Sequence, residues 1–251
     1  MRALAIAAVL VGSALAGCAP PAPAIPEPGP SIAEWGRALQ VLARLRRSAA
    51  VASTRHLALE LREPRTGRVL SARGAVAVLP PRALRMILLG PGGTTALDLW
   101  ASEDRYRFAV PVIDLQKRGS LQGPREERRG LPVDFLTFWL LRPASGRLLW
   151  HAREAFADRF VLRDGTAIVD LRAFTDGRIE ARRATWSSPT ADGARQTLLD
   201  EETVSADKLG CGGVRYHQRS TGLDVTVRCE SETPGEPPAR ALVDPDAEAA
   251  P

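Results

Sequence analysis

The sequence predicts a mainly β fold with helices, an α+β arrangement in which about ten antiparallel strands are flanked by two helices. Apolar and polar residues alternate over many short segments, a period typical of strands with one buried face. Turn-forming residues such as Pro80-Pro81 and Asp164-Gly165 separate these segments at short intervals. Two further segments lack the alternation and have the apolar spacing or the apolar content of helices.

The first predicted helix follows residue 30. Residues Ser31-Ile32-Ala33-Glu34 have the form of a capping box, in which serine and glutamate satisfy backbone N–H groups at a helix start. The apolar residues after it recur at spacings of three and four, which predicts an amphipathic helix ending near Arg47. These residues are Ile32, Trp35, Leu39, Leu42 and Leu45.

A first block of alternating segments then predicts a meander of antiparallel strands. The segments are residues 57–61, 74–79, 84–89, 95–100 and 105–110. Residues 119–130 are polar and charged, which predicts a mobile loop. Residues 131–141 are very apolar and precede Pro143, and they are interpreted as a short second helix.

A second block of strands is predicted after this helix, and it ends in a hairpin. Its segments are residues 159–162, 166–173, 178–186, 194–203, 214–219 and 223–228. Cys211 and Cys229 flank the hairpin at matched positions, so we expect a structural disulfide in an oxidising compartment. Residues 232–251 are rich in Pro, Ala and acidic residues, and their composition predicts a disordered tail.

The amino terminus has the layout of an export signal. Arg2, an apolar run over residues 3–10 and small residues after it are typical of a signal peptide, here residues 1–17. Leu15-Ala16-Gly17-Cys18 resembles a lipobox, which implies cleavage before Cys18 and acylation of its thiol. The alternative is an ordinary secretory signal with a chance cysteine. Ala19, where an inner-membrane retention signal places Asp, favours the periplasmic face of the outer membrane. Residues 18–30 are rich in Pro and Ala, a composition that predicts an extended linker above the membrane.

The net charge of the chain indicates which classes of binding partner to expect. The formal net charge is +5 and the calculated pI is about 9.7. An exported chain meets anionic lipid head groups and acidic proteins rather than nucleic acid, so no nucleic-acid partner is expected. The arginines also have a simpler explanation, namely genomic base composition and a solvated surface.

The residues do not form a recognisable catalytic constellation. His56, His151 and His217 each fall in or beside a predicted strand, without the spacing of metal ligands. Gly90-Pro91-Gly92-Gly93 lies between strands and opens no helix, which excludes a phosphate loop. We therefore expect neither enzymatic activity nor a cofactor or bound metal.

Two segments resemble the LolA/LolB family of lipoprotein-localisation proteins. Residues 71–74 followed by 84–99 look like the family's strand, NPxGxT-like turn and strand, and residues 131–141 are similar to its apolar helix after the central loop. Together the matches cover about half of the mature chain. The resemblance implies that residues 31–231 form an incomplete, curved antiparallel half-barrel closed by short helices, with an apolar cavity that accepts acyl chains.

This resemblance assigns a candidate ligand-binding set. Alternation can direct six strand residues to one side, and three helix residues would form a lid. The nine residues are Met86, Leu88, Leu97, Leu99, Phe108, Val110, Phe135, Phe138 and Trp139. The alternative is that they simply fill a core. Gly92 stands where the family's receptor has a leucine thought to deliver cargo to the membrane, which puts that delivery step in doubt.

The first functional hypothesis is a monomeric, lipid-anchored protein that binds acyl chains of lipids or other lipoproteins and serves lipoprotein reception or localisation. The resemblance adds a LolA-like periplasmic carrier as a partner. The second hypothesis is a non-enzymatic accessory lipoprotein whose half-barrel is a filled interaction scaffold in an envelope or secretion assembly. A third is a binder of glycolipid head groups through the arginine surface.

Overall fold

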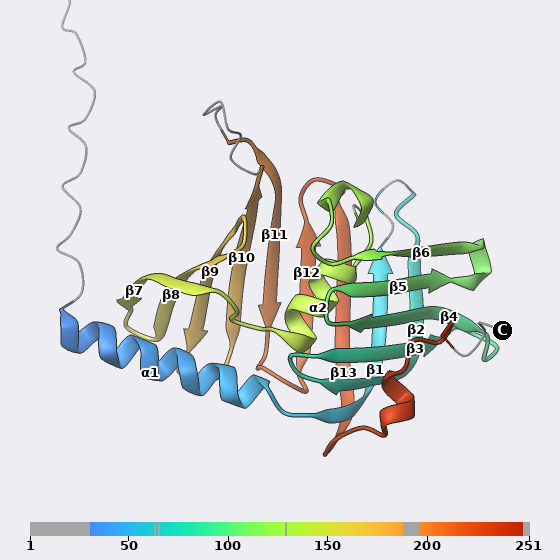
Figure 1. Cartoon of the computed structure of the whole chain (residues 1–251), viewed down its shortest axis with the longest axis horizontal. Coiled ribbons are helices and arrows are strands. Elements are labelled where there is room, and N and C mark those ends of the chain that lie inside the picture. The colour runs from blue at the N-terminus through green and yellow to red at the C-terminus, as the bar shows by residue number, and fades with distance from the viewer. Residues whose placement is uncertain (1–30, 63, 65, 129, 188–195, 248–251) are drawn as a thin grey trace, which may run out of the picture.

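The computed structural model describes residues 31–62, 64, 66–128, 130–187 and 196–247, and its strands belong to one antiparallel sheet (Figure 1). The strands are β1 Ser53–Arg62, β2 Val69–Leu79, β3 Ala83–Leu89, β4 Thr95–Ser102, β5 Arg105–Val110, β6 Leu115–Ser120, β7 Arg147–Arg153, β8 Ala157–Asp164, β9 Ala167–Phe174, β10 Ile179–Trp186, β11 Leu198–Ala206, β12 Gly213–Gln218 and β13 Leu223–Pro234. Their order is β6-β5-β4-β3-β2-β1-β13-β12-β11-β10-β9-β8-β7. Because β6 and β7 are the two edges and do not pair, the curved sheet stays open, which confirms the predicted half-barrel.

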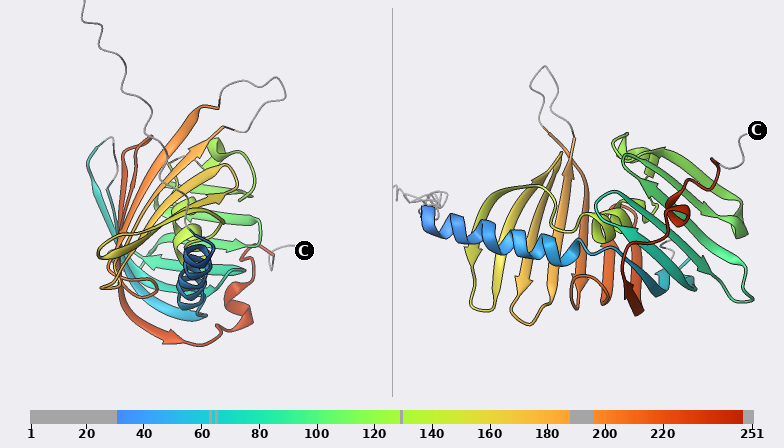
Figure 2. Two further views of the ribbon diagram at one scale, coloured as in Figure 1. Left: turned by 90° about the vertical axis from the view of Figure 1, so that its left-hand side faces the viewer. Right: turned by 60° about the horizontal axis from the view of Figure 1, so that its bottom comes forward.

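Helix α1, Ile32–Ala49, lies within the curve of the sheet (Figure 2). The predicted capping box is present: the Glu34 backbone N–H donates to Ser31 Oγ at 3.3 Å, and the Ser31 N–H donates to Glu34 Oε2 at 2.7 Å. The helix extends two residues past Arg47, and Ala38 and Leu42 are buried in the core of the protein. Arg46 ties the end of the helix to the chain before β7 by donating from Nε to the Ala144 carbonyl oxygen at 2.9 Å.

Helix α2, Val133–Leu141, is the second predicted helix, and it lies between the two edge strands in sequence. Eight of its nine residues are buried, so the helix is covered on all sides rather than along one stripe. It packs against β2 and β3 on the same side of the sheet as α1. The two helices therefore fill the concave side of the half-barrel.

Each strand of the sheet directs one set of side chains to the concave side and the other outward. Leu57 and Leu59 of β1, for example, are buried, while His56 before them and Glu60 after them are exposed on the other side. The inward residues of both halves of the sheet join with the helices in one hydrophobic core. The alternation that predicts the strands therefore also gives the correct buried face.

The sheet has 13 strands, and two of them lie outside the segments that the sequence predicts as strands. β6 has a single apolar side chain, Leu115, and overlaps the predicted loop 119–130 only at its end. β7 contains a bulge between Leu148 and Trp150, where an extra residue interrupts the alternation of apolar and polar positions. Both are edge strands, which carry less buried surface and hence a weaker sequence pattern.

The prediction of disorder after residue 231 is wrong for residues 232–247. β13 continues to Pro234 beside β1, and Ala239–Leu242 form a 3₁₀ turn, η3. Glu232 lies opposite Arg55, and its Oε1 accepts hydrogen bonds from Arg55 Nε at 2.8 Å and Ser53 Oγ at 2.9 Å. Composition predicts disorder because this segment has few apolar groups, but it is held by strand pairing and ion pairs instead. Residues 248–251 lie outside the described residues.

The disulfide between Cys211 and Cys229 is present, with the two Cα atoms 5.1 Å apart. The bridge closes a loop of 18 residues at the open end of the β12–β13 hairpin. Closing a loop of this size contributes about 3 kcal/mol by restricting the unfolded chain. We therefore expect Cys211→Ser/Cys229→Ser to lower Tm by roughly 6–12 °C, given about 2–4 °C per kcal/mol for a domain of this length. Calorimetry with and without reductant checks this, since reductant should lower Tm only in the wild-type protein.

The predicted signal peptide, Cys18 and the linker lie outside the described residues. Within the described part of the chain, no helix is long and apolar enough to cross a membrane.

Candidate ligand-binding interior

The structure brings the nine predicted ligand-binding residues together beside α2. Met86 of β3 lies directly opposite Leu99 of β4, and Leu99 lies opposite Phe108 of β5, so the three form one row on the concave face. Leu88 and Leu97 form a second pair. Phe135, Phe138 and Trp139 of α2 belong to the same buried cluster, and Val110 packs at its margin.

This interior is filled in the conformation described. Met86, Leu88 and Leu99 have no accessible surface, and Phe108 retains 2%. A side chain with no accessible surface also borders no internal void large enough for water, because such a void would count as accessible surface. The predicted cavity is therefore closed here, and a ligand could enter only if the side chains of this cluster moved apart.

Several contacts hold α2 in place. Phe135 stacks on Tyr216 of β12, with ring centroids 4.3 Å apart and an angle of 16° between the planes. Arg128, which is 7% exposed, donates from Nε to Asp134 Oδ1 at 2.7 Å and from Nη1 to the Ser120 carbonyl oxygen at 2.8 Å. The Arg128–Asp134 ion pair thus fastens the start of the helix to the chain after β6.

The chain on both sides of α2 contains glycines with left-handed backbone conformations. Gly130 has φ +80° and Gly146 has φ +107°, a region that residues with a Cβ rarely adopt. At Gly146 the chain also passes very close to the backbone of Arg163, so a Cβ there would lie 2.6 Å from the Arg163 carbonyl oxygen. The helix is therefore an insert joined to the sheet through two sharp turns.

Acidic side chains line the interior near α2, a feature that the sequence analysis missed. Glu202 of β11 is 3% exposed, and its carboxylate accepts hydrogen bonds from Tyr216 Oη at 2.8 Å and Arg183 Nη1 at 3.1 Å. The Arg183 guanidinium carbon also lies 5.9 Å from the centre of the Phe138 ring. Glu202 lies two and four residues before the apolar Val204 and Ala206, so all three point to the same side of β11. This spacing was the one feature of the sequence that could have predicted an inward-pointing carboxylate.

A polar pocket of about 60 Å³ lies beside α2, next to Arg183 of β10. Arg128, Asp134, Phe138, Arg142 and Arg183 are among the residues that line it. Its volume can hold water molecules but not an acyl chain. The interior is thus apolar along β3, β4 and β5 and polar at the β10–β12 side of the helix.

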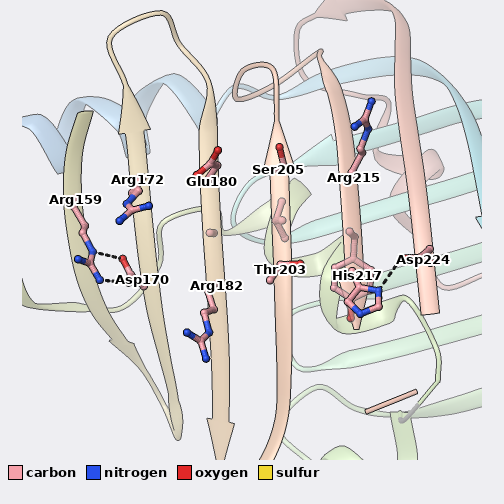
Figure 3. A pocket seen from close by; sticks show the side chains of 13 residues that line it. Arg159, Asp170, Arg172, Glu180, Arg182, Thr203, Ser205, Arg215, His217 and Asp224 are labelled. Atoms are coloured by element: carbon pink, nitrogen blue, oxygen red, sulfur yellow. Dashed lines mark hydrogen bonds and ion pairs between the residues drawn. The ribbon is translucent and has the colours of Figure 1, made fainter. Parts of the chain in front are cut away.

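A second, shallow groove of about 510 Å³ lies on the outer face of β8–β13 (Figure 3). Arg159 forms two hydrogen bonds with Asp170, and these bonds hold the pKa of the Asp170 carboxyl below its usual value. His217 Nδ1 and Asp224 Oδ1 are 2.8 Å apart. Among the described residues, no hydroxyl or thiol is hydrogen-bonded to His217, and no three His, Cys, Asp or Glu side chains group as metal ligands. The described groove therefore presents paired surface charges without a nucleophile–base pair.

Comparisons with known proteins gave matches only among solved structures. No family model matches the chain, and no curated protein matches it. A LolA-superfamily protein from Nitrosomonas europaea is 10% identical with a TM-score of 0.48, over 82% of this chain and 97% of that one.

Two further solved structures are similar to the chain. A putative outer-membrane lipoprotein-sorting domain from Vibrio parahaemolyticus is 11% identical with a TM-score of 0.40, over 78% and 93% of the two chains. A DUF1329-family protein from Desulfovibrio piger is 11% identical with a TM-score of 0.41, over 84% and 98%.

Proposed function

We propose that this protein is a lipid-anchored, non-enzymatic binder of acyl chains, and that a chain enters the interior when α2 moves away from β2 and β3. One observation carries the proposal: the nine predicted residues meet in a single apolar cluster that is closed by a helix buried on all sides. Such a helix contributes apolar surface that an equally apolar ligand can replace. The acyl chains of membrane lipids or of other lipoproteins have this chemistry.

The cost of moving α2 and the gain from an acyl chain are of the same order. Seven apolar side chains of α2 are buried, and exposing them would cost about 1.5–3 kcal/mol for each, or roughly 10–21 kcal/mol together. An acyl chain of about 16 carbons regains roughly 0.8 kcal/mol for each buried methylene, or about 12 kcal/mol. A single long chain can therefore offset the lower part of this range, whereas a short chain cannot.

The proposal places the protein at the periplasmic face of the outer membrane, attached through the acyl groups on Cys18. The lipoprotein acyl chains that it would receive come by way of a LolA-like periplasmic carrier. Both statements rest on the signal-like and lipobox-like residues of the first 19 positions and on the family resemblance. Gly92, in the β3–β4 turn, has φ +85° and is exposed, and it offers no apolar side chain for insertion into lipid.

Weakening the fastening of α2 should strengthen binding. In Asp134→Asn the ion pair with Arg128 is lost, which lowers the cost of moving the helix, so we expect about threefold to tenfold tighter binding, equivalent to roughly 0.7–1.4 kcal/mol. The measurement is titration of the protein, produced without acylation, with a fluorescent 16-carbon fatty acid. The matched control is Glu236→Gln, since Glu236 pairs with Arg82 on the exposed surface at 3.9 Å.

A second variant tests the lining directly. Phe138→Asp should abolish uptake of the fatty acid while membrane attachment through Cys18 is retained. If neither the wild type nor Asp134→Asn binds the probe, the interior is a permanent core and the acyl-chain proposal fails. If both bind it equally, the chain does not enter by displacing α2, and that part of the proposal fails.

The filled interior favours a second candidate function, an interaction scaffold of an envelope assembly. Inaccessible side chains such as Met86 and Leu99 are what a permanent core requires. Native mass spectrometry of the unacylated protein separates the two functions. Co-purified lipid supports acyl-chain binding, whereas a consistently ligand-free protein supports the scaffold.

A further inference from the structure

The segment after β13 covers part of the outer face of the sheet, on the side opposite the interior (Figure 2). We call residues 235–247 the C-terminal strap. Trp100 of β4 points outward, yet it is only 4% exposed, and its Nε1 donates to the Leu242 carbonyl oxygen at 2.8 Å. An outward tryptophan of a sheet is buried here because the strap lies against it.

Arginines surround Trp100 on this face. Arg85 of β3 and Arg107 of β5 lie directly opposite Trp100 on either side. Arg118 lies on β6, the next strand. We call Arg85, Trp100, Arg107 and Arg118 the arginine face. Asp98, also on this face, accepts from Arg85 at 2.9 Å and from Arg107 at 2.8 Å. Without the strap, the face would present three guanidinium groups against one carboxylate.

The strap supplies the missing negative charges at alternate positions. Asp246 Oδ2 is 3.0 Å from Arg107 Nε and 3.0 Å from Arg118 Nη2, and Asp244 also pairs with Arg118. Leu242, two residues before Asp244, provides the carbonyl oxygen that Trp100 contacts. The face is thus occupied by a segment with the pattern Leu-x-Asp-x-Asp, which begins in η3 and turns after Asp244, where the Ala247 N–H donates to the Asp244 carbonyl oxygen at 3.0 Å.

The fit between the strap and the arginine face is incomplete. Arg85 Nε and Asp98 Oδ1 are buried without a hydrogen-bond partner. A groove of about 460 Å³ remains between the strap and the sheet, beside Ile87, which is 42% exposed. The fastening ion pairs are also partly exposed, with Arg118 at 44% and Asp246 at 33%. Partly exposed pairs are weak and screened by salt, so the strap can be displaced by a segment that fits better.

We propose that the arginine face is a docking site for an acidic segment of a partner protein, and that the strap occupies this site until the partner displaces it. The partner segment would carry an apolar residue followed by acidic residues two and four positions later, as the strap does. A larger apolar side chain would fill the groove beside Ile87. This site is independent of the acyl-chain interior because it lies on the other face of the sheet.

The test uses the full chain and a fluorescein-labelled peptide with the sequence of residues 238–247. Asp244→Ser/Asp246→Ser should release the strap and let the peptide bind at 50 mM salt. The wild-type protein should bind the same peptide at least tenfold more weakly, because its site is occupied and the apparent Kd rises as the free fraction falls. Raising the salt to 300 mM should weaken peptide binding to the variant severalfold.

Two controls identify the site. Adding Arg107→Ser to the variant should abolish peptide binding, whereas adding Arg182→Ser, which changes an exposed arginine on β10, should not. The proposal is overturned if the wild type and the variant bind the peptide equally, or if neither binds it. It is also overturned if the released variant binds vesicles containing phosphatidylglycerol but not the peptide, since the occupant would then be a membrane.

Discussion

Replacing Gly74 with alanine is expected to destabilise the protein by more than about 4 kcal/mol, the range of the most severe core substitutions. Gly74 lies in the middle of β2, between Leu57 of β1 and Leu88 of β3. A Cβ built on Gly74 would overlap the Ile87 carbonyl oxygen and lie 2.9 Å from Leu88 Cα. These are backbone atoms of a paired strand, so they can move aside only if the β2–β3 pairing breaks.

A matched control for this substitution is Gly36→Ala in α1. No atom lies within 4 Å of a Cβ at Gly36, and alanine is favoured over glycine inside a helix by about 1 kcal/mol. Chemical denaturation of both variants should therefore give free energies of unfolding that change in opposite directions. A Gly74→Ala protein as stable as the wild type would show that β2 and β3 can separate locally at little cost.

The case of Gly74 shows what the sequence reveals and what it hides. Residues 71–74 supported the family resemblance, but a sequence cannot show that another strand's backbone approaches one glycine this closely. The alternation of apolar residues did predict the correct inward face of the strands that carry Met86, Leu99 and Phe108. Alternation records which side of a strand is buried, and that is a local property.

The state of the interior could not be predicted in the same way. The same apolar residues are compatible with a hollow pocket and with a filled core, and only the position of α2 distinguishes the two. The inward Glu202 illustrates the related problem for polar groups. Its partners, Tyr216 and Arg183, lie on neighbouring strands, and the sequence does not give their distance.

The prediction of disorder for the carboxyl-terminal segment fails for a different reason. Disorder was predicted from low apolar content, a criterion that weighs burial of hydrocarbon and ignores specific ion pairs. Here Glu232, Asp244 and Asp246 each meet an arginine that is more than 50 residues away in sequence. Contacts between such distant residues leave no periodic signal. The segment is structured because its charges match those of the folded sheet.

Replacing Glu232 with alanine is therefore expected to destabilise the protein strongly, by about 3–5 kcal/mol, the cost of leaving one member of a buried ion pair alone. Arg55 is 3% exposed, and Glu232 is its only carboxylate partner among the described residues. The matched control is Glu230→Ala, since Glu230 pairs with Arg73, and both side chains of that pair are largely exposed. Surface pairs contribute about 0–1 kcal/mol, so the control should be close to wild type in urea denaturation.

The pH dependence gives an independent test of the same pair. Burial raises the pKa of the Glu232 carboxyl, but hydrogen bonds from Arg55 and Ser53 outweigh burial and leave the pKa below its ordinary value of 4.5. A carboxyl whose pKa is lower in the folded state stabilises the fold above its unfolded pKa, and this contribution is lost as the pH falls through the folded pKa. The wild type should therefore lose stability below about pH 4.5 more steeply than Glu232→Ala.

A double substitution decides whether the pair acts through its charge or its shape. In Arg55→Leu/Glu232→Leu no buried charge is left alone, and replacing a buried pair by apolar side chains is often neutral or stabilising. We expect the double variant to recover most of the stability that Glu232→Ala loses and to lose the extra slope below pH 4.5. If Glu232→Ala is as stable as Glu230→Ala, the end of β13 is held by its pairing with β1 and does not depend on this ion pair.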